Sequence, residues 1–469
     1  MRHLHAFGDD ALGHLDAVGL IEALNAGRLG RVEVVEAAIA RAEAANPALN
    51  GLAHEAFDKA RAQAAAPARS GYFSGVPTFI KDNVDVAGLP TMRGTDAWPP
   101  RPADAHGEFA RMYLATGMIP LGKTQMSEYG FSASAEHPRL GPVHNPWNTD
   151  HTPGASSSGS GAFVAAGVVP IAHANDGGGS IRIPASCNGL VGLKPSRGRL
   201  PLDKEVRQMP IRIVANGVVS RSVRDTAAFY REAERIWPAK KLPTIGDLQH
   251  AGKKRLRVAV ITHSLLRECS REVRELTLKS AALLDELGHK VDHLEKPPIP
   301  NSFVSDFVLY WGLLAMGQIQ QNKRAFDGFD VTRLDNLTRG LDRHARRNLH
   351  KVPLALVRLF RTRRYTERLA RAYDVVLTPT LADEPPPIGY LDPTADYQQI
   401  IDRLQDWVAY TPLQNVTGEP AISLPLATSA SGLPVGMMFS AAMGQEARLL
   451  ELAYELEDAR PWARIDQQA

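Results

Sequence analysis

Residues 173–187 read HANDGGGSIRIPASC, in which three consecutive glycines stand directly before Ser180. Glycine loses more conformational freedom on folding than any other residue, so a run of three needs a reason. One reason is a simple loop, because glycine-rich turns are common between strands and helices. Another is a reaction site, where the bare backbone N–H groups of Gly177, Gly178 and Gly179 let a carbonyl oxygen approach and hold the charge that develops on it.

Ser180 itself stands between an apolar segment typical of a strand and one typical of a short helix. Free backbone N–H groups and the positive end of a helix dipole would then lie near its hydroxyl. The same placement suits a serine that only caps a helix, and this stretch alone does not exclude that role. Known serine motifs do not decide the matter, because G-x-S-x-G fails at Arg182 and no lysine has a serine three residues before it. His173 and Asp176 are close in sequence, but we expect His173 to be a packed strand residue.

Two further segments carry residues suited to the same chemistry. Lys81 ends the apolar run VPTFI and precedes Asp82. This predicts either an ordinary ion pair or a buried lysine whose pKa is lowered by desolvation, so that it can act as a base. The stretch PGASSSGSG at 153–161 has the composition of a linker or a phosphate-binding loop. It lacks the lysine that a P-loop requires, and the segment after it is too apolar for a linker.

The elements that must position these residues alternate along the whole chain. The strand-like segments are 75–85, 119–124, 255–264 and 373–380, and the helical ones are 10–66, 222–236, 271–288 and 303–373. Alternation of this kind predicts an α/β fold in which helices cover a large sheet. We expect one domain over 1–469, with a helical N-terminal arm at 1–66 and an inserted, mainly helical cap segment at about 237–372, which begins at a break rich in proline and lysine.

The bulk composition excludes several classes of protein. The chain has 469 residues, and 54 basic against 51 acidic side chains leave a net charge of +3. That charge is too small to indicate a nucleic acid or an anionic membrane as partner, and we interpret the basic run 342–351 as a solvated helix face. Cys187 and Cys269 are too few for a disulfide framework or a four-ligand zinc site. With no signal-like apolar run at the N-terminus, these features predict a cytoplasmic protein.

Taken together, the segments resemble the amidase signature hydrolases. The likeness covers nearly the whole chain and is greatest with actinobacterial members of the mycobacterial type. Its blocks include GVPTFIKDNVDVAG, LGKTQMSEYGF, GPVHNPWN, PGASSSGSGAFVAAGVVPIAHANDGGGSIRIPAS, GLVGLKPSRGRLP and NVTGEPAISLPLATSASGLPVGMMFSA. The resemblance implies the amidase signature fold, a large mixed twisted β-sheet between α-helices. It also implies hydrolysis of a carboxylic amide to a carboxylate plus ammonia or an amine, through an acyl-enzyme and without metal or organic cofactor.

The resemblance also assigns roles to residues. Ser180 matches the nucleophile, Ser156 the bridging serine that follows a cis peptide bond, and Lys81 the base. The remaining matches fall into three groups: backbone N–H groups of an oxyanion hole (Gly177, Gly178, Gly179, Ser180), loop-bracing residues (Asp176, Arg182, Ser157) and substrate contacts (Tyr129, Phe131, Thr95, Trp311). The chain departs from the family in having Gly-Ala-Ser-Ser-Ser-Gly where Gly-Gly-Ser-Ser-Gly-Gly is usual, but the three catalytic positions are intact.

The resemblance leaves alternatives open. The amide could be linear or cyclic, aliphatic, aryl or peptidic, and a homodimer is only the common default. Within the family, the rival is the A subunit of a tRNA-dependent amidotransferase, which releases ammonia from glutamine and passes it to a partner subunit. Outside enzymes, the rival is a relative that binds amides without hydrolysing them. We expect a stand-alone amidase that acts on a small-molecule substrate, without nucleic acid or membrane as partner.

Overall fold

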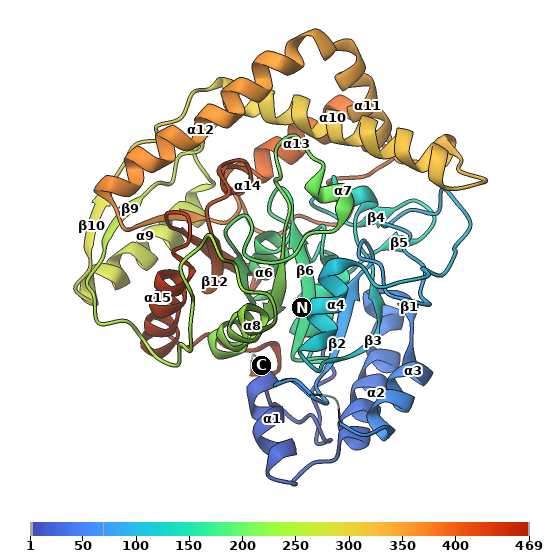
Figure 1. Cartoon of the computed structure of the whole chain (residues 1–469). Coiled ribbons are helices and arrows are strands. Elements are labelled where there is room, and N and C mark those ends of the chain that lie inside the picture. The colour runs from blue at the N-terminus through green and yellow to red at the C-terminus, as the bar shows by residue number, and fades with distance from the viewer. Residues whose placement is uncertain (1–2, 69, 468–469) are drawn as a thin grey trace.

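A mixed sheet of eight strands forms the centre of the computed structural model, which describes residues 3–68 and 70–467 (Figure 1). The strand order is β10-β9-β11-β13-β12-β7-β8-β6. The strands are β6 (Ile171–Asp176), β7 (Val191–Lys194), β8 (Ala215–Ser220), β9 (Arg257–Val260), β10 (Lys290–His293), β11 (Val375–Pro379), β12 (Ala421–Thr428) and β13 (Pro434–Ser440). Strand β9 pairs in parallel with β10 and β11, and the other neighbours pair antiparallel. The predicted α/β class with a large mixed sheet is therefore confirmed.

A second sheet of three strands lies against the β6 edge of the large sheet. It has the order β1-β3-β2, formed by β1 (Leu52–Glu55), β3 (Ile119–Thr124) and β2 (Pro77–Lys81). All five residues of β2 are buried, as its run of apolar residues predicts. Side chains join the two sheets, since Thr78 Oγ1 donates to the carbonyl oxygen of Ile171 at 2.9 Å. This junction brings the end of β2 beside the end of β6, which precedes the glycine run.

Residues 3–66 form an arm with helices α1 (Ala17–Asn25), α2 (Arg31–Leu49) and α3 (Phe57–Ala65). The arm is not wholly helical, because β1 interrupts it and pairs with β3. Helix α2 continues through Pro47 to Leu49. Pro47 lies in the last turn, so the hydrogen bond that it cannot donate, to the carbonyl oxygen of Glu43, is lost near the end of the helix and not in its middle.

Helix α5 (Ser158–Ala165) explains why the stretch at 153–161 is rich in small residues. All of its residues are buried. A Cβ atom added at Gly159 would lie 2.1 Å from the carbonyl oxygen of Gly51 in the arm, and one at Gly161 would lie 2.8 Å from Asn188 Nδ2. Glycine is therefore required here for close packing of a buried helix. The stretch is not a linker, because residues 153–157 form a buried irregular segment and the rest belongs to the buried helix.

The inserted segment contributes both strands and helices. Strands β9 and β10 with α9 (Arg271–Glu286) extend one edge of the sheet, while α10 (Ser302–Ala325), α11 (Asn336–Arg347) and α12 (Val352–Ala372) form an outer layer across the top of the view (Figure 1). By length and apolar composition, α10 is the one helix in the described part of the chain that could cross a membrane. Here it packs against α11 and α12 and buries Leu309, Ala315 and Ile319.

The remaining helices surround the sheets. They are α4 (Glu108–Ala115), α6 (Arg182–Asn188), α7 (Lys204–Arg207), α8 (Val223–Ile236), α13 (Tyr397–Trp407), α14 (Pro412–Thr417) and α15 (Glu446–Ala459), and two short strands, β4 (Glu136–His137) and β5 (Gly141–Pro142), form a separate hairpin. Helices α6 and α14 matter for the site, because the first follows the glycine run and the second packs beside it.

Candidate active site

Lys81 and Ser156 meet in the interior between the two sheets. Lys81 Nζ lies 2.7 Å from Ser156 Oγ, and both side chains are buried. The same amino group donates to Asn175 Oδ1 at 2.7 Å, and the Asn175 amide is held in turn by Asn83. The peptide bond between Ala155 and Ser156 is cis. Lys81, at the end of β2, therefore contacts Ser156, which precedes α5.

Burial determines the charge state of Lys81. Among the described residues, no carboxylate lies within 4 Å of its amino group. Burial lowers the pKa of Lys81 to about 7, and the more distant charge of Asp176 opposes that shift only in part. A neutral amine is then populated near neutral pH and has a lone pair free to accept a proton.

Ser180 occupies the turn between β6 and α6 and borders a cavity. It is 7% exposed, which leaves its hydroxyl within reach of a molecule in that cavity. It does not cap the helix, because α6 has Ile181 at its N-cap with no side-chain cap, and the Asp176 carboxylate accepts from the N–H of Ile181 instead. The hydroxyl of Ser180 is thus not used by the helix.

Within the glycine run before Ser180, Gly179 is the position where a side chain would not fit. Gly179 has φ +140°, and a Cβ atom there would lie 2.4 Å from Thr411 Oγ1. A Cβ at Gly177 or Gly178 would lie 3.5–3.6 Å from the ring of Trp311. The N–H of Gly179 donates to Asp176 Oδ1 at 2.7 Å. This differs from our expectation that all four N–H groups of the run face the substrate, because the one at Gly179 is committed to the loop.

A buried ion pair holds the loop in shape. Arg182 lies against Asp176 with an N–O distance of 2.9 Å, and neither side chain is exposed. Burial alone would raise the pKa of Asp176, but the charge and hydrogen bonds of Arg182 outweigh it and lower the pKa to about 2. Ser157 Oγ donates to the carbonyl oxygen of Ser180 at 2.6 Å. All three residues expected to brace the loop therefore contact it.

His173 has a structural role in β6. Its Nδ1 accepts the backbone N–H of Lys81 at 3.2 Å, and its ring lies 4.5 Å from that of Phe109. Burial lowers the pKa of His173 to about 3, with the charge of Lys81 adding to the shift. Asp176 pairs with Arg182 and not with His173, so these two residues do not form a His–Asp pair that could activate a nucleophile.

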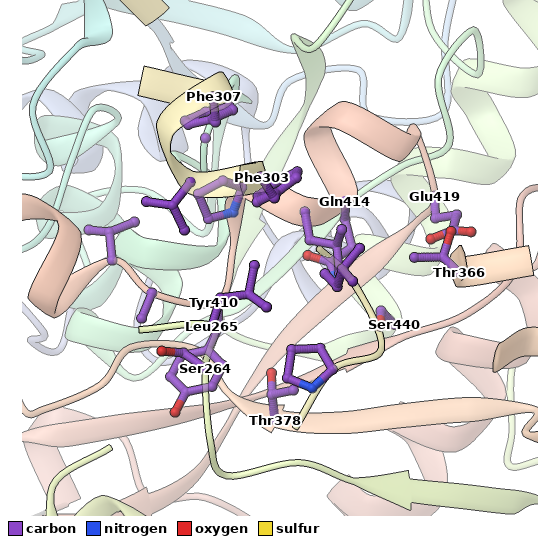
Figure 2. A pocket seen from close by; sticks show the side chains of 18 of the residues that line it. Ser264, Leu265, Phe303, Phe307, Thr366, Thr378, Tyr410, Gln414, Glu419 and Ser440 are labelled. Atoms are coloured by element: carbon purple, nitrogen blue, oxygen red, sulfur yellow. The ribbon is translucent and has the colours of Figure 1, made fainter. Parts of the chain in front are cut away.

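The cavity beside Ser180 has a volume of about 160 Å³ and mostly apolar walls (Figure 2). Of the four expected substrate contacts, Phe131 and Trp311 line it. Tyr129 and Thr95 are not among its lining residues: Tyr129 Oη accepts from Asn322 Nδ2 at 2.7 Å, and Thr95 Oγ1 donates to the buried Glu128 at 2.7 Å.

Several residues of the site lie outside the motifs singled out in the sequence. Asn415 Nδ2 donates to Asp176 Oδ1 at 2.8 Å, and Thr411 Oγ1 donates to the carbonyl oxygen of Gly178 at 2.5 Å. Gln414 accepts from Arg182 at 3.1 Å and also lines the cavity. Gln414 and Asn415 belong to α14 and Thr411 is its N-cap residue, more than 200 positions along the chain from the loop. Asn415 begins the block NVTGEPAIS that carries part of the family resemblance, whereas Thr411 and Gln414 precede it, and no sequence pattern predicted that any of the three contacts the loop.

Comparison with known proteins places this arrangement in a family. A family model described as Amidase matches residues 33–450. The chain belongs to the amidase signature family. A Mycobacterium leprae protein named "Putative amidase AmiC" is 70% identical over 99% of both chains. The 6-aminohexanoate-cyclic-dimer hydrolase of a Pseudomonas strain is 33% identical over 95% of both chains.

Solved structures of the family share the architecture. A 6-aminohexanoate cyclic dimer hydrolase has a TM-score of 0.87 at 30% identity and covers 98% of this amidase and 99% of its own chain. A bacterial aryl acylamidase of the amidase signature family has a TM-score of 0.83 at 26% identity, covering 96% and 97%. The expected amidase signature fold is thus confirmed, and the chain is an amidase-family hydrolase that acts on amides.

Proposed function

We propose that this chain is a stand-alone amidase that cleaves the C–N bond of a carboxylic amide with Ser180 as nucleophile, Ser156 as proton relay and Lys81 as base. One observation carries the proposal: a buried lysine without a carboxylate partner lies 2.7 Å from Ser156 Oγ. Burial of a lysine without an opposite charge lowers the stability of the fold, and perturbed groups of this kind concentrate at reaction sites.

The first half of the reaction forms an ester. Neutral Lys81 takes the proton of Ser156 Oγ as Ser156 takes that of Ser180 Oγ, and Ser180 Oγ attacks the amide carbon. Backbone N–H groups of the glycine run stabilise the negative charge on the carbonyl oxygen. Because the N–H of Gly179 donates to Asp176, the candidates are the N–H groups of Gly177, Gly178 and Ser180. The intermediate collapses when the C–N bond breaks, and the relay returns the proton to the departing amine.

The second half regenerates the enzyme. Water loses a proton to the same relay and attacks the ester carbon, and the carboxylate leaves as Ser180 Oγ recovers its proton. Each step uses only side chains and backbone groups of this chain. The Asp176–Arg182 pair keeps the loop in one shape while charge develops, so little reorganisation is needed during the reaction.

The test is release of ammonia or amine by the purified protein from a panel of aliphatic, aryl, amino-acid and cyclic amides, with glutamine included. Ser180→Ala should abolish turnover, because a triad acts as a unit. Ser431→Ala, in the turn between β12 and β13 and outside the cavity lining, is the matched control. Unchanged turnover in Ser180→Ala would disprove the assignment. Hydrolysis of glutamine alone, together with a tightly bound second subunit, would favour an amidotransferase subunit instead.

A further inference from the structure

Glu419 is a buried carboxylate that lines the same cavity as Ser180. It follows α14 and precedes β12, and it is 7% exposed. The wall between the two residues is largely apolar, with Leu265, Phe303 and Leu413 among the lining side chains. Figure 2 shows the Glu419 carboxylate beside Thr366 on α12, apart from Ser264 and Tyr410. Thr366, Gln414 and Ser440 also line this part of the cavity, but none of them carries a charge.

Glu419 differs from the buried carboxylates of Asp176 and Glu446 in having no ion-pair partner among the described residues. Asp225 is also buried without such a partner, but the backbone N–H groups of Ala17 and Val18 donate to its two oxygens. Asp176 pairs with Arg182, and Glu446 pairs with Arg199, each at 2.9 Å. Among the described residues, no basic nitrogen lies within 4 Å of the Glu419 carboxylate, and Thr417 Oγ1 donates to it at 3.0 Å. Buried charges are normally paired, because removing an ion from water costs several kcal/mol.

The basic groups whose charges act on Glu419 have their hydrogen-bond or ion-pair partners elsewhere. Arg197 donates to the carbonyl oxygens of Asn415 and Val416. Lys194 donates to the carbonyl oxygen of Pro195 at 2.8 Å, and Arg363 pairs with Glu367 at 2.8 Å. Burial raises the pKa of Glu419, and the hydrogen bonds of Thr366 and Thr417 and the charges of Lys194 and Arg363 only partly oppose it. The carboxylate therefore lacks a cation at contact distance and borders open space from which one could approach.

Helix α14 sets the separation between Glu419 and the glycine run. At its start, Thr411 Oγ1 contacts the carbonyl oxygen of Gly178, and at its end Gly418 leads into Glu419. A helix of six residues is about 9 Å long. Because three bonds of an extended chain cover about 3.5 Å, six to eight bonds span roughly that length.

We propose that Glu419 binds a primary ammonium group of the substrate, so that this amidase selects amides in which an apolar chain of about six to eight bonds joins the reacting carbonyl to an amine. The proposal rests on the proposed function, because it uses the cavity beside Ser180. The ammonium can belong to the acyl part or to the departing amine, and both place the same cation against the same carboxylate.

Two matched pairs of amides test the proposal. ω-Aminohexanamide against heptanamide carries the ammonium on the acyl side, and N-(ω-aminopentyl)acetamide against N-hexylacetamide carries it on the amine side. Each pair exchanges an ammonium for a methyl group at constant length. We expect kcat/KM to favour the charged member of one pair by about ten- to 100-fold, as for a hydrogen bond to a charged group. The pair that shows the preference identifies the side.

Substitution of Glu419 should remove that preference. In Glu419→Gln the ratio of charged to neutral kcat/KM should fall to one or below, mainly through a higher KM for the charged amide. Ser440→Ala, a lining residue without charge, should keep the wild-type ratio. A wild-type enzyme that prefers both neutral amides, or a ratio that survives Glu419→Gln, would overturn the proposal. Glu419→Asp and thermal melts separate loss of the charge from loss of the fold.

Equilibrium binding separates this proposal from the proposed function. The Ser180→Ala protein should bind ω-aminohexanamide or N-(ω-aminopentyl)acetamide more tightly than the neutral analogue by calorimetry, and the double variant with Glu419→Gln should lose the difference. Binding that depends on Glu419 without any turnover by the wild type would refute the catalytic proposal and keep the subsite. Turnover of neutral amides without preferential binding of the charged ones would refute the subsite and keep catalysis.

Discussion

Two neighbouring strands each carry a fully buried lysine, and the two lysines are in opposite situations. Lys81 ends β2 and Lys123 lies next to the end of β3, one position apart in the parallel register. Lys123 Nζ lies 3.0 Å from Asp82 Oδ1 and donates to the Pro90 carbonyl oxygen and to Thr91 Oγ1. Lys81 instead contacts Ser156 and Asn175, which carry no charge.

The comparison shows that partners, more than depth, decide what a buried lysine does. Burial lowers the pKa of both, but at Lys123 the adjacent Asp82 opposes the shift by charge and by hydrogen bond. At Lys81 the opposing charge is the more distant Asp176, and the pKa falls to about 7. Lys123 is a structural ion, whereas Lys81 carries a cost in stability of the kind seen where a group is kept for chemistry.

The largest effect is expected from Lys81→Met. Methionine has a similar length but no base, so kcat/KM for any amide substrate should fall by at least about 10³-fold. The free energy of unfolding should stay the same or rise, since a costly buried amine is removed and Asn175 Oδ1 keeps its bond from Asn83. Rates and denaturant unfolding of the same preparation measure both. An active variant would remove Lys81 from the mechanism.

For Lys123→Met we expect a loss of stability, in contrast to Lys81→Met. It leaves Asp82 buried without a cation, and the free energy of unfolding should fall by about 3–5 kcal/mol. Adding Asp82→Asn should recover much of that loss, because the pair is then replaced rather than broken. Urea unfolding of the two variants measures the coupling. Equal losses in stability for Lys81→Met and Lys123→Met would contradict the distinction between the two lysines.

Asn175→Asp should give Lys81 an adjacent carboxylate, as Lys123 has in Asp82. A carboxylate oxygen at the present amide position, 2.7 Å from Lys81 Nζ, should raise the pKa of Lys81 by about 1–3 units. The base is then protonated at neutral pH, so kcat/KM at pH 7 should fall about tenfold or more. Raising the pH should restore most of the rate. A loss that is independent of pH would point to altered geometry at the site.

The smallest effect is the pH dependence of the unmodified enzyme. Lys81 must be neutral to accept a proton, and its pKa is about 7. Rates should therefore be constant above that pH and should fall about tenfold for each unit below it. Initial rates across the pH range, corrected for reversible unfolding, measure this limb. A flat acid limb would mean that another group acts as the base.

The sequence made some of these features predictable and hid others. The residue types at positions 81, 156 and 180 suggested what chemistry each could do. Only the resemblance to a family predicted that Lys81, Ser156 and Ser180 form one site, because hydrophobic periodicity does not reveal which loops lie together. Helix or strand character followed from local pattern over most of the chain. We expected Thr95 to contact the substrate, but it donates to Glu128, and we did not predict that Thr411 contacts Gly178. Both contacts depend on packing between segments far apart in the chain, which local sequence patterns do not reveal.

The close approach of Gly159 to Gly51 has a consequence for engineering this enzyme. The carbonyl oxygen of Gly51 also accepts the N–H of Gln125, and Gln125 accepts the N–H of Gly159. The N-terminal arm, the end of β3 and helix α5 therefore contact one another at one point, where a side chain at position 159 would not fit. The N-terminal arm is not an interchangeable module: trimming it or grafting another in its place would displace Ser156 as well.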